Sequence, residues 1–160
     1  MKGLIRALRI EELDFVSNLA LRSKGYWGYS QDFLDACKEE LSISPGEFHN
    51  SKFQFRVMEY ENRIIGYYAV CHLDSNTYEL DALFVEPVFI GKGVGNQLID
   101  HAKSLVTQRG GTKIILQAEP NAEPFYLKAG ANIVGKKESQ SIRGRYLSLL
   151  EIDLGVKHVA

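Results

Sequence analysis

The sequence has little cysteine and no excess of charge of either sign, and these shortages exclude several classes of protein. Cys37 and Cys71 are the two cysteines, and neither belongs to a Cys-x-x-Cys or Cys/His pattern. We therefore expect buried reduced thiols rather than a disulfide. The histidines show no metal-ligand spacing, so no metal is expected. Lysine and arginine number 19 against 20 aspartate and glutamate, which argues against a nucleic-acid partner.

Long apolar runs are also missing. The first ten residues are interrupted by charges, and no stretch approaches the roughly 20 apolar residues that a membrane span requires. We therefore expect no membrane partner and a cytoplasmic location. The length of 160 residues fits a single domain over residues 1–160 with a core of its own.

Hydrophobic periodicity predicts two helices near the N-terminus. Residues 5–10 alternate like a short edge strand, and a helix that breaks at Gly25 follows. Glu11 and Glu12 open that helix, where acidic side chains suit the helix dipole. Ser30 is the expected N-cap of a second helix, which ends in residues 42–46.

The period then changes from helical to extended. Residues 53–60 alternate, residues 61–63 form a hairpin turn, and residues 64–73 are nearly all apolar. Such an apolar run is typical of a central strand that is covered on both faces. Residues 77–85 complete an antiparallel meander after a turn at residues 74–76.

A crossover follows the meander. An amphipathic helix stops at Gly110 and Gly111, and residues 113–118 form a buried strand parallel to the third meander strand. Asn121 is the expected cap of a short helix, before closing strands at residues 133–138 and 146–154. The predicted fold is a mixed α/β sandwich: a mostly antiparallel central sheet, helices on both faces, and one parallel β-α-β crossover.

The stretch from Val85 to Gln97 contains three alternating glycines, Gly91, Gly93 and Gly95, where a strand becomes a helix. Glycines let the backbone approach a ligand closely, and the first turn of a helix has unpartnered N–H groups at the positive end of its dipole. The loop therefore predicts an anion site, and its alternative is a glycine-rich turn without a ligand.

Two well-known phosphate loops do not fit this stretch. A P-loop requires Gly-x-x-x-x-Gly-Lys followed by Ser or Thr, and no window supplies it. A dinucleotide-binding fingerprint requires a third glycine at position 98, where the chain has Leu98.

The order of motifs around the loop resembles the GCN5-related N-acetyltransferase (GNAT) superfamily. A strand, Glu-Pro, Gly-x-Gly, an amphipathic helix and a buried strand are followed by Asn121 and then the block Pro-Phe-Tyr-x-Lys-Ala-Gly. The acyl-CoA signature of that family maps onto Ile90, Gly93 and Gly95. Ile90 departs from the polar residue usual in the family, which puts one side-chain contact in doubt rather than the cofactor.

This resemblance implies that acetyl-CoA is the co-substrate. Backbone N–H groups from Gly91 to Asn96 would hold the pyrophosphate, and Phe84 and Val85 would pair with the pantetheine arm like an extra strand. The N–H of Val85 could also polarise the thioester carbonyl. The cofactor-binding residues so implied are Phe84, Val85, Ile90, Gly91, Lys92, Gly93, Val94, Gly95, Asn96, Asn121 and Lys128.

The resemblance also implies direct attack of an amine on the thioester, assisted by two side chains. Tyr126 aligns with the tyrosine that protonates the leaving thiolate, and a phenol is mostly protonated at neutral pH. Glu79 resembles the strand glutamate used as a base, and Asp81 is expected on the same face of the strand. Alternatively, Tyr126 packs in the core and Glu79 is a solvated carboxylate.

The acceptor is the amine of a small molecule or a protein, and a homodimer is compatible with the sequence. Arg22, Tyr26, Trp27 and Tyr29, with the loop near Arg143 and Arg145, are the substrate-binding candidates that the resemblance implies. The alternative function is an acyl-CoA-binding or sensing domain without efficient transfer. A further alternative is a domain with an empty loop that contacts proteins through an edge strand.

Overall fold

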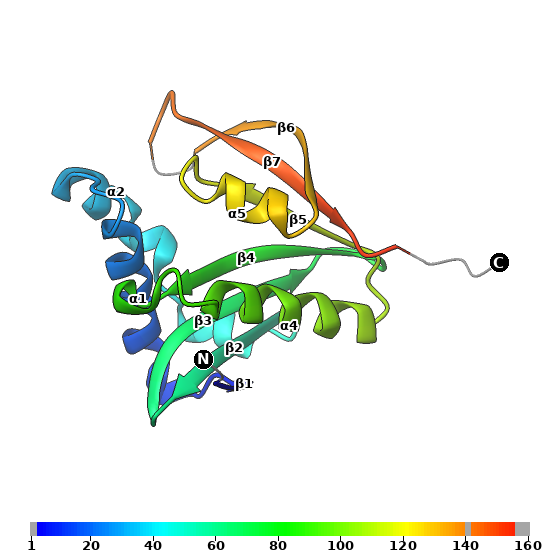
Figure 1. Cartoon of the computed structure of the whole chain (residues 1–160), viewed down its shortest axis with the longest axis horizontal. Coiled ribbons are helices and arrows are strands. Elements are labelled where there is room, and N and C mark those ends of the chain that lie inside the picture. The colour runs from blue at the N-terminus through cyan, green and yellow to red at the C-terminus, as the bar shows by residue number, and fades with distance from the viewer. Residues whose placement is uncertain (1–2, 140–141, 156–160) are drawn as a thin grey trace.

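The computed structural model describes residues 3–139 and 142–155 as one seven-stranded sheet with helices on both faces (Figure 1). The strand order is β1-β2-β3-β4-β5-β7-β6. Neighbouring strands are antiparallel except β4 and β5, which are parallel. The strands are β1 (Leu4–Ala7), β2 (Phe53–Tyr60), β3 (Arg63–His72), β4 (Thr77–Val85), β5 (Lys113–Ala118), β6 (Ala131–Glu138) and β7 (Tyr146–Asp153).

Helix α4 lies on one face of the sheet, and α1 with α2 lies on the other (Figure 1). Ser30 caps α2 as predicted, because its hydroxyl accepts the N–H of Phe33 at 3.1 Å. The helices are α1 (Leu13–Gly25), α2 (Gln31–Leu41), α3 (Pro45–His49), α4 (Val94–Gln108) and α5 (Glu123–Lys128), and the 3-10 turns are η1 (Ile10–Glu12) and η2 (Pro87–Phe89).

The sheet separates two apolar cores. Leu98 and Ala102 of α4 pack on one face, and Val16 and Leu19 of α1 pack on the other. Strand β3 supplies side chains to both cores, which is why its sequence is apolar without alternation. The two cores therefore cover the centre of the sheet on both faces.

Four local predictions need correction. The first strand ends at Ala7 because residues 10–12 turn into η1, where Glu12 accepts the N–H of Arg9. Helix α3 was not predicted, although Ser44 and Glu47 form a capping box there. Asn121 does not cap α5, because Ala122 occupies the N-cap position and makes no side-chain cap bond. The fourth correction concerns the alternation of β4.

Strand β4 contains a bulge at Asp81. Val70 of β3 faces Leu80 and Ala69 faces Ala82, so that Asp81 has no partner on β3. Strict alternation along β4 therefore fails at this residue, and bulges commonly redirect side chains next to functional sites. Glu79 and Asp81 nevertheless border the same cavity.

Both cysteines are free thiols, with Cys37 buried and Cys71 partly buried. Among residues 3–139 and 142–155, no helix is long and apolar enough to cross a membrane. The predicted loop over residues 139–145 includes residues 140 and 141, which lie outside the described residues.

Strands β4 and β5 pair over only three residues each. Thr77 to Glu79 pair with residues 113–115, and the remainder of β4 has no strand on that side in the described chain. Figure 1 shows the two strands diverging from the end where they pair. This wedge leaves the edge of β4 open, and the candidate site residues lie around it.

Candidate active site

The glycine loop leads from β4 into α4 through two residues in the left-handed region. Gly91 has φ +83° and Gly93 has φ +86°, and an added Cβ at either position would meet no atom within 4 Å. Glycine is required here by the backbone conformation rather than by crowding. The loop surface above these two residues is therefore open.

The start of α4 presents N–H groups that can bind an anion. The first helical bond there runs from the N–H of Gln97 to the carbonyl of Gly93 at 3.2 Å. Within the described residues, the N–H groups from Gly91 to Asn96 have no acceptor. Val94 is buried and anchors the helix to the core, whereas Lys92 and Asn96 are exposed. This geometry fits a diphosphate such as that of acetyl-CoA.

Gly95 and Ile90 have packing roles in the loop. A Cβ on Gly95 would lie 3.2 Å from Cε1 of Phe125, so glycine lets α4 approach α5 closely. Ile90 is partly buried and ends η2. Lys128, the last residue of α5, is exposed.

The open edge of β4 directs a backbone donor into the wedge. The N–H of Val85 points away from β3 and donates to Oγ of Ser23 on α1 at 3.4 Å. Ser23 is buried, and it borders the main cavity together with Phe84. An extended ligand arm could pair with this edge, because its backbone groups have no strand partner in the described chain.

The main cavity, of about 520 Å³, lies between α1, α2 and the splayed strands. Its wall carries six carboxylates and two lysines, so the cavity favours cations. The acidic residues are Glu39, Glu40, Glu47, Glu79, Asp81 and Glu119, and the basic ones are Lys24 and Lys137.

Among these carboxylates, Asp81 has a pKa above the ordinary value of an aspartate. Desolvation, followed by repulsion from Glu79, Glu47 and Glu40, raises the pKa of Asp81 to about 6, although part of the residue is exposed. Neither Glu79 nor Asp81 has a hydrogen bond or ion pair with another described residue. Both carboxylates therefore remain available to a ligand in the cavity.

Tyr126 lies in the core next to α4 and is 7% exposed. Burial raises the pKa of its hydroxyl above the ordinary value of a phenol. The hydroxyl has no hydrogen-bond partner among the described residues, so Tyr126 remains protonated and can donate a hydrogen bond. Tyr126 does not border the main cavity.

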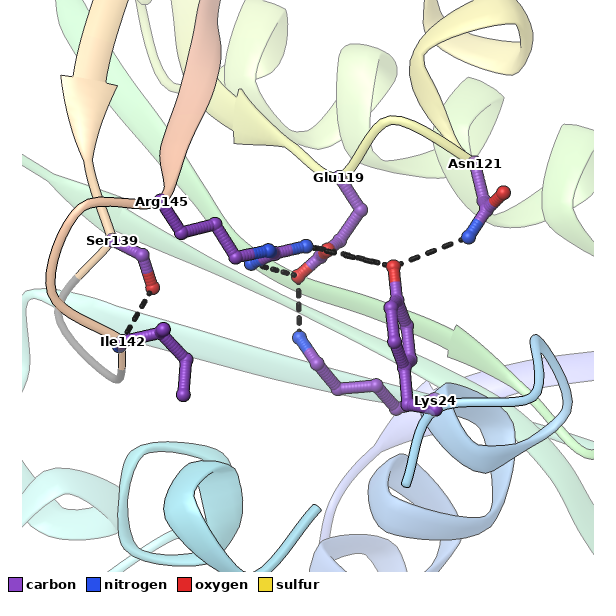
Figure 2. Close-up of polar contacts among 7 residues, drawn as sticks. Lys24, Glu119, Asn121, Ser139, Ile142 and Arg145 are labelled. Atoms are coloured by element: carbon purple, nitrogen blue, oxygen red, sulfur yellow. Dashed lines mark hydrogen bonds and ion pairs between the residues drawn. The ribbon is translucent and has the colours of Figure 1, made fainter. Parts of the chain in front are cut away.

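Glu119, directly after β5, joins three segments beside the cavity (Figure 2). Its carboxylate forms ion pairs with Lys24 of α1 and Arg145 before β7, and it accepts the hydroxyl of Tyr29 at 3.2 Å. Burial opposes ionisation, but the hydrogen bonds from Arg145 and Lys24 hold the pKa of Glu119 below its usual value. Asn121 donates to the hydroxyl of Tyr29 at 3.1 Å.

The predicted acceptor residues fall into two groups. Trp27 and Tyr29 border the cavity, whereas Arg22 and Tyr26 do not. Arg22 instead forms a two-bond ion pair with the buried Glu86, at 2.7 and 2.8 Å. This pair fixes α1 to the chain just before the glycine loop. Tyr26 is 52% exposed and packs edge-on against Trp27.

Sequence reasoning missed Ser23, Glu47 and Glu119 as site residues. Ser23 is 62 residues from its partner Val85, and no local pattern signals such a contact. A sequence pattern could have located Glu47, because Ser44 and Glu47 have the spacing of a capping box, which predicts the start of helix α3.

The fold and the candidate site define an α/β domain with unpartnered N–H groups at the start of α4, an open strand edge and an acidic cavity. Residues 28–141 match the acetyltransferase (GNAT) domain family. The chain therefore belongs to this family, which confirms the resemblance and the fold class predicted from the sequence.

Two sets of individual proteins are similar to the chain. Peptidyl-lysine N-acetyltransferase YjaB of Salmonella typhimurium is 33% identical over 67 residues, which are 42% of this chain and 45% of that protein. The match thus spans less than half the length of that curated relative. The Escherichia coli protein of the same name is also 33% identical over 67 residues, covering 42% of this chain and 44% of that protein.

Solved structures share the fold along almost the whole chain. The PaiA N-acetyltransferase of Thermoplasma acidophilum, in complex with coenzyme A, has a TM-score of 0.78 at 20% identity and covers 96% of this chain and 99% of its own. An aminoglycoside 6′-N-acetyltransferase complexed with coenzyme A has a TM-score of 0.74 at 18% identity, over 98% and 99%.

Proposed function

We propose that this domain transfers the acetyl group of acetyl-CoA to an amine. Family membership supports the reaction type and acetyl-CoA as the co-substrate. The observation that carries the proposal is the continuous arrangement of the open glycine loop, the unpaired edge of β4 and the cavity beside that edge. An extended thioester can follow this path from its diphosphate to its reacting end.

The chain's own groups have defined tasks in this reaction. The N–H groups from Gly91 to Asn96 bind the diphosphate, helped by Lys92 and Lys128. The edge of β4 at Phe84 and Val85 orients the arm of the thioester, with Asn121 as a further contact. When the acyl carbonyl binds, the N–H of Val85 exchanges the hydroxyl of Ser23 for the carbonyl oxygen and stabilises the charge that develops there.

Proton transfer needs a base in the cavity. Alkyl ammonium groups have a pKa of roughly 10, so the amine must lose a proton before it attacks. Glu79 borders the cavity and has no partner among the described side chains, so we assign it as the base, acting directly or through a water. Glu79→Gln should lower kcat about 100-fold while acetyl-CoA still binds, and a retained kcat would exclude this role.

Tyr126 acts on the leaving sulfur in this proposal. A thiol has a pKa of about 8.5 and a free phenol about 10, and burial raises the pKa of Tyr126 further. Complete proton transfer from Tyr126 to the thiolate is therefore unfavourable. Tyr126 stabilises the departing thiolate as a hydrogen-bond donor, and the released thiolate takes its proton from solvent water.

The acceptor is a cationic amine. Six carboxylates against two lysines line the cavity, and Trp27 and Tyr29 supply aromatic faces that can contact an ammonium group. The peptidyl-lysine acetyltransferase relative supports an amine that is protonated in solution. Both a small molecule and a protein side chain meet this description.

A panel of acceptors tests the function. Purified protein is incubated with acetyl-CoA and with primary amines, lysine peptides, aminoglycosides or amino acids, and release of free thiol is measured. Turnover with cationic amines, and little with neutral or acidic amino compounds, is expected. Binding of acetyl-CoA without turnover for any amine would favour an acyl-CoA sensor, and absence of binding would contradict both functions.

A further inference from the structure

Glu86 is a buried carboxylate at the junction between strand β4 and the glycine loop. It directly follows Val85, whose N–H is the donor assigned to the acyl carbonyl, and it is 8% exposed. An ionised carboxylate is costly to bury unless it is paired and hydrogen-bonded. The position of Glu86 therefore depends on its polar partners.

Three segments of the chain meet at Glu86. Its N–H donates to the carbonyl of Ile65 on β3 at 2.8 Å, and its carbonyl accepts the N–H of Phe89 in η2 at 2.8 Å. Its carboxylate accepts two bonds from Arg22 of α1, from Nε at 2.7 Å and from Nη2 at 2.8 Å. Glu86 thus joins the sheet, the start of the loop and α1.

The guanidinium of Arg22 is held in one plane by two contacts. Besides its two bonds to Glu86, it lies over the ring of Phe15 on the same helix, 5.5 Å from the ring centroid. A two-bond pair between a guanidinium and a carboxylate fixes both groups in a geometry that an ammonium group cannot reproduce. The side chain of Arg22 is 44% exposed, so its truncation does not empty space in the core.

Arg22 and Ser23 are consecutive residues of α1, and they contact two consecutive residues at the end of β4. Ser23 accepts the N–H of Val85 at 3.4 Å. This contact is given up when an acyl carbonyl takes the N–H of Val85. The ion pair between Arg22 and Glu86 does not involve that N–H, so it remains as a charged tether between α1 and the backbone next to the donor.

We propose that the ion pair between Arg22 and Glu86 positions the N–H of Val85 toward the acyl carbonyl during transfer. Neither Arg22 nor Glu86 borders the main cavity, so both act through the backbone rather than on the substrate. The proposal gives Arg22 a positioning role in place of the acceptor contact that the resemblance implied. This inference rests on the proposed acetyltransferase function.

Substitution of Arg22 should lower kcat with little change in the KM for acetyl-CoA. A group that acts mainly in the transition state changes kcat rather than ground-state binding. A displacement of about 1 Å can cost roughly 100-fold in rate, so we expect kcat to fall about 100-fold in Arg22→Ala. Arg22→Lys keeps the charge but loses the second bond, and its kcat should fall about tenfold. The KM for acetyl-CoA should stay within about threefold of the wild-type value in both variants.

Arg6→Lys is the matched control. Arg6 also donates two bonds to one carboxylate, that of Glu12, at 3.0 and 2.8 Å, in a partly buried pair outside the cavity wall. Arg6→Lys should lower the Tm about as much as Arg22→Lys and leave kcat unchanged. Equal losses of kcat in the two variants would refute the positioning role.

A double variant tests whether the two side chains act as one unit. Glu86→Gln removes the charge and keeps the shape of the side chain, and its kcat should fall about tenfold. Because paired residues are not additive, the loss in Arg22→Ala/Glu86→Gln should be no greater than in Arg22→Ala alone. Losses that multiply would mean that the two residues act independently, which would contradict the pair.

The carbonyl of bound acetyl-CoA reports the donor directly. A hydrogen bond polarises a thioester carbonyl and lowers its stretching frequency, which infrared difference spectroscopy measures with an isotope-labelled acetyl group. The bound frequency should lie below the free value in the wild type and in Arg6→Lys, and it should move toward the free value in Arg22→Ala. The same frequency in Arg22→Ala and the wild type would overturn the proposal.

This spectrum separates the positioning role from the proposed function, because it requires no turnover. A lowered carbonyl frequency that is lost in Arg22→Ala would support the pair even if the wild-type protein acetylated no amine. Acetylation of amines with an unchanged kcat in Arg22→Ala would leave the function intact and reject the pair. A carbonyl at its free frequency in the wild type would reject the Val85 donor and the role of the pair together.

Discussion

The N–H of Val85 donates to the hydroxyl of Ser23 across 3.4 Å, between the open edge of β4 and helix α1. Ser23 is thus the internal acceptor for the donor that the proposed reaction assigns to the acyl carbonyl. The distance is at the long end of hydrogen bonds, so replacement of this contact by a ligand costs little.

Ser23→Ala should strengthen the binding of acetyl-CoA. The variant removes the competing acceptor, and a weak hydrogen bond contributes about 0.5 kcal/mol, so we expect the Kd of acetyl-CoA to fall about twofold. Isothermal titration calorimetry measures the Kd. Steady-state turnover assays measure kcat, which should stay within about twofold of the wild-type value. A loss of kcat beyond tenfold would instead mean that Ser23 donates to a reacting group.

Tyr126→Phe should lower kcat by about 10–100-fold, as expected for the loss of one hydrogen bond to a charged group. The raised pKa of Tyr126 keeps its hydroxyl protonated through the alkaline range. The pH profiles of kcat for the wild type and the variant should therefore run parallel from pH 6 to pH 9. An alkaline limb that is present in the wild type and missing from the variant would contradict the hydrogen-bond role.

The glycine loop and the crossover are the parts of the molecule that the sequence predicts well. Gly91 and Gly93 signal left-handed backbone, and the apolar core of residues 113–118 defines β5 to the residue. Both signals are local, because they depend on the conformation of one residue or on burial of one short segment.

Local sequence patterns of this kind cannot predict contacts between distant segments. Ser23 meets Val85 and Glu119 meets Arg145 only after the helices dock on the sheet. The bulge at Asp81 is a one-residue irregularity in a pattern of apolar and polar alternation, which cannot reveal it. The open loop was therefore predictable, whereas the composition of the acidic cavity required the structure.

Asp81→Asn should stabilise the protein at alkaline pH. The folded-state pKa of about 6 is above the unfolded value of about 3.9, so the contribution of Asp81 to stability is present below pH 4 and lost as the pH rises through 6. Solvent screening limits the effect to about 1 kcal/mol, or roughly 2–4 °C in Tm. Thermal melts should show a higher Tm for the variant at pH 8 and equal values at pH 3.5.

Gly93→Ala should weaken acetyl-CoA binding as well as the fold. A Cβ in the left-handed region costs about 1 kcal/mol, and the strained loop misdirects the N–H groups before α4. Gly110→Ala is a matched control, because Gly110 has φ +87° against +86° for Gly93 and also has no atom within 4 Å of an added Cβ. Both variants should lose similar stability, and only Gly93→Ala should raise the Kd of acetyl-CoA.

Glu119→Gln should loosen the mouth of the cavity. The variant leaves Lys24 and Arg145 partly buried without their shared carboxylate, which we expect to cost about 2 kcal/mol of stability at pH 7. Because hydrogen bonds lower the pKa of Glu119, its contribution is present above the unfolded pKa of about 4.3. It is lost as the pH falls through the folded value, so the two melts should converge in acid.

Glu119→Gln should also change the KM for the acceptor amine, because Glu119 connects α1, Tyr29 and the segment before β7 around the cavity. The KM for the amine is expected to rise about fivefold or more, as a position held by roughly 1 kcal/mol or more is lost. Glu59→Gln is the control, since Glu59 shares Arg6 with Glu12 in a second partly buried cluster outside the cavity wall. Glu59→Gln should lose stability and keep its KM. An equal rise of KM in both variants would assign the effect to general loosening of the sheet rather than to the position of Glu119.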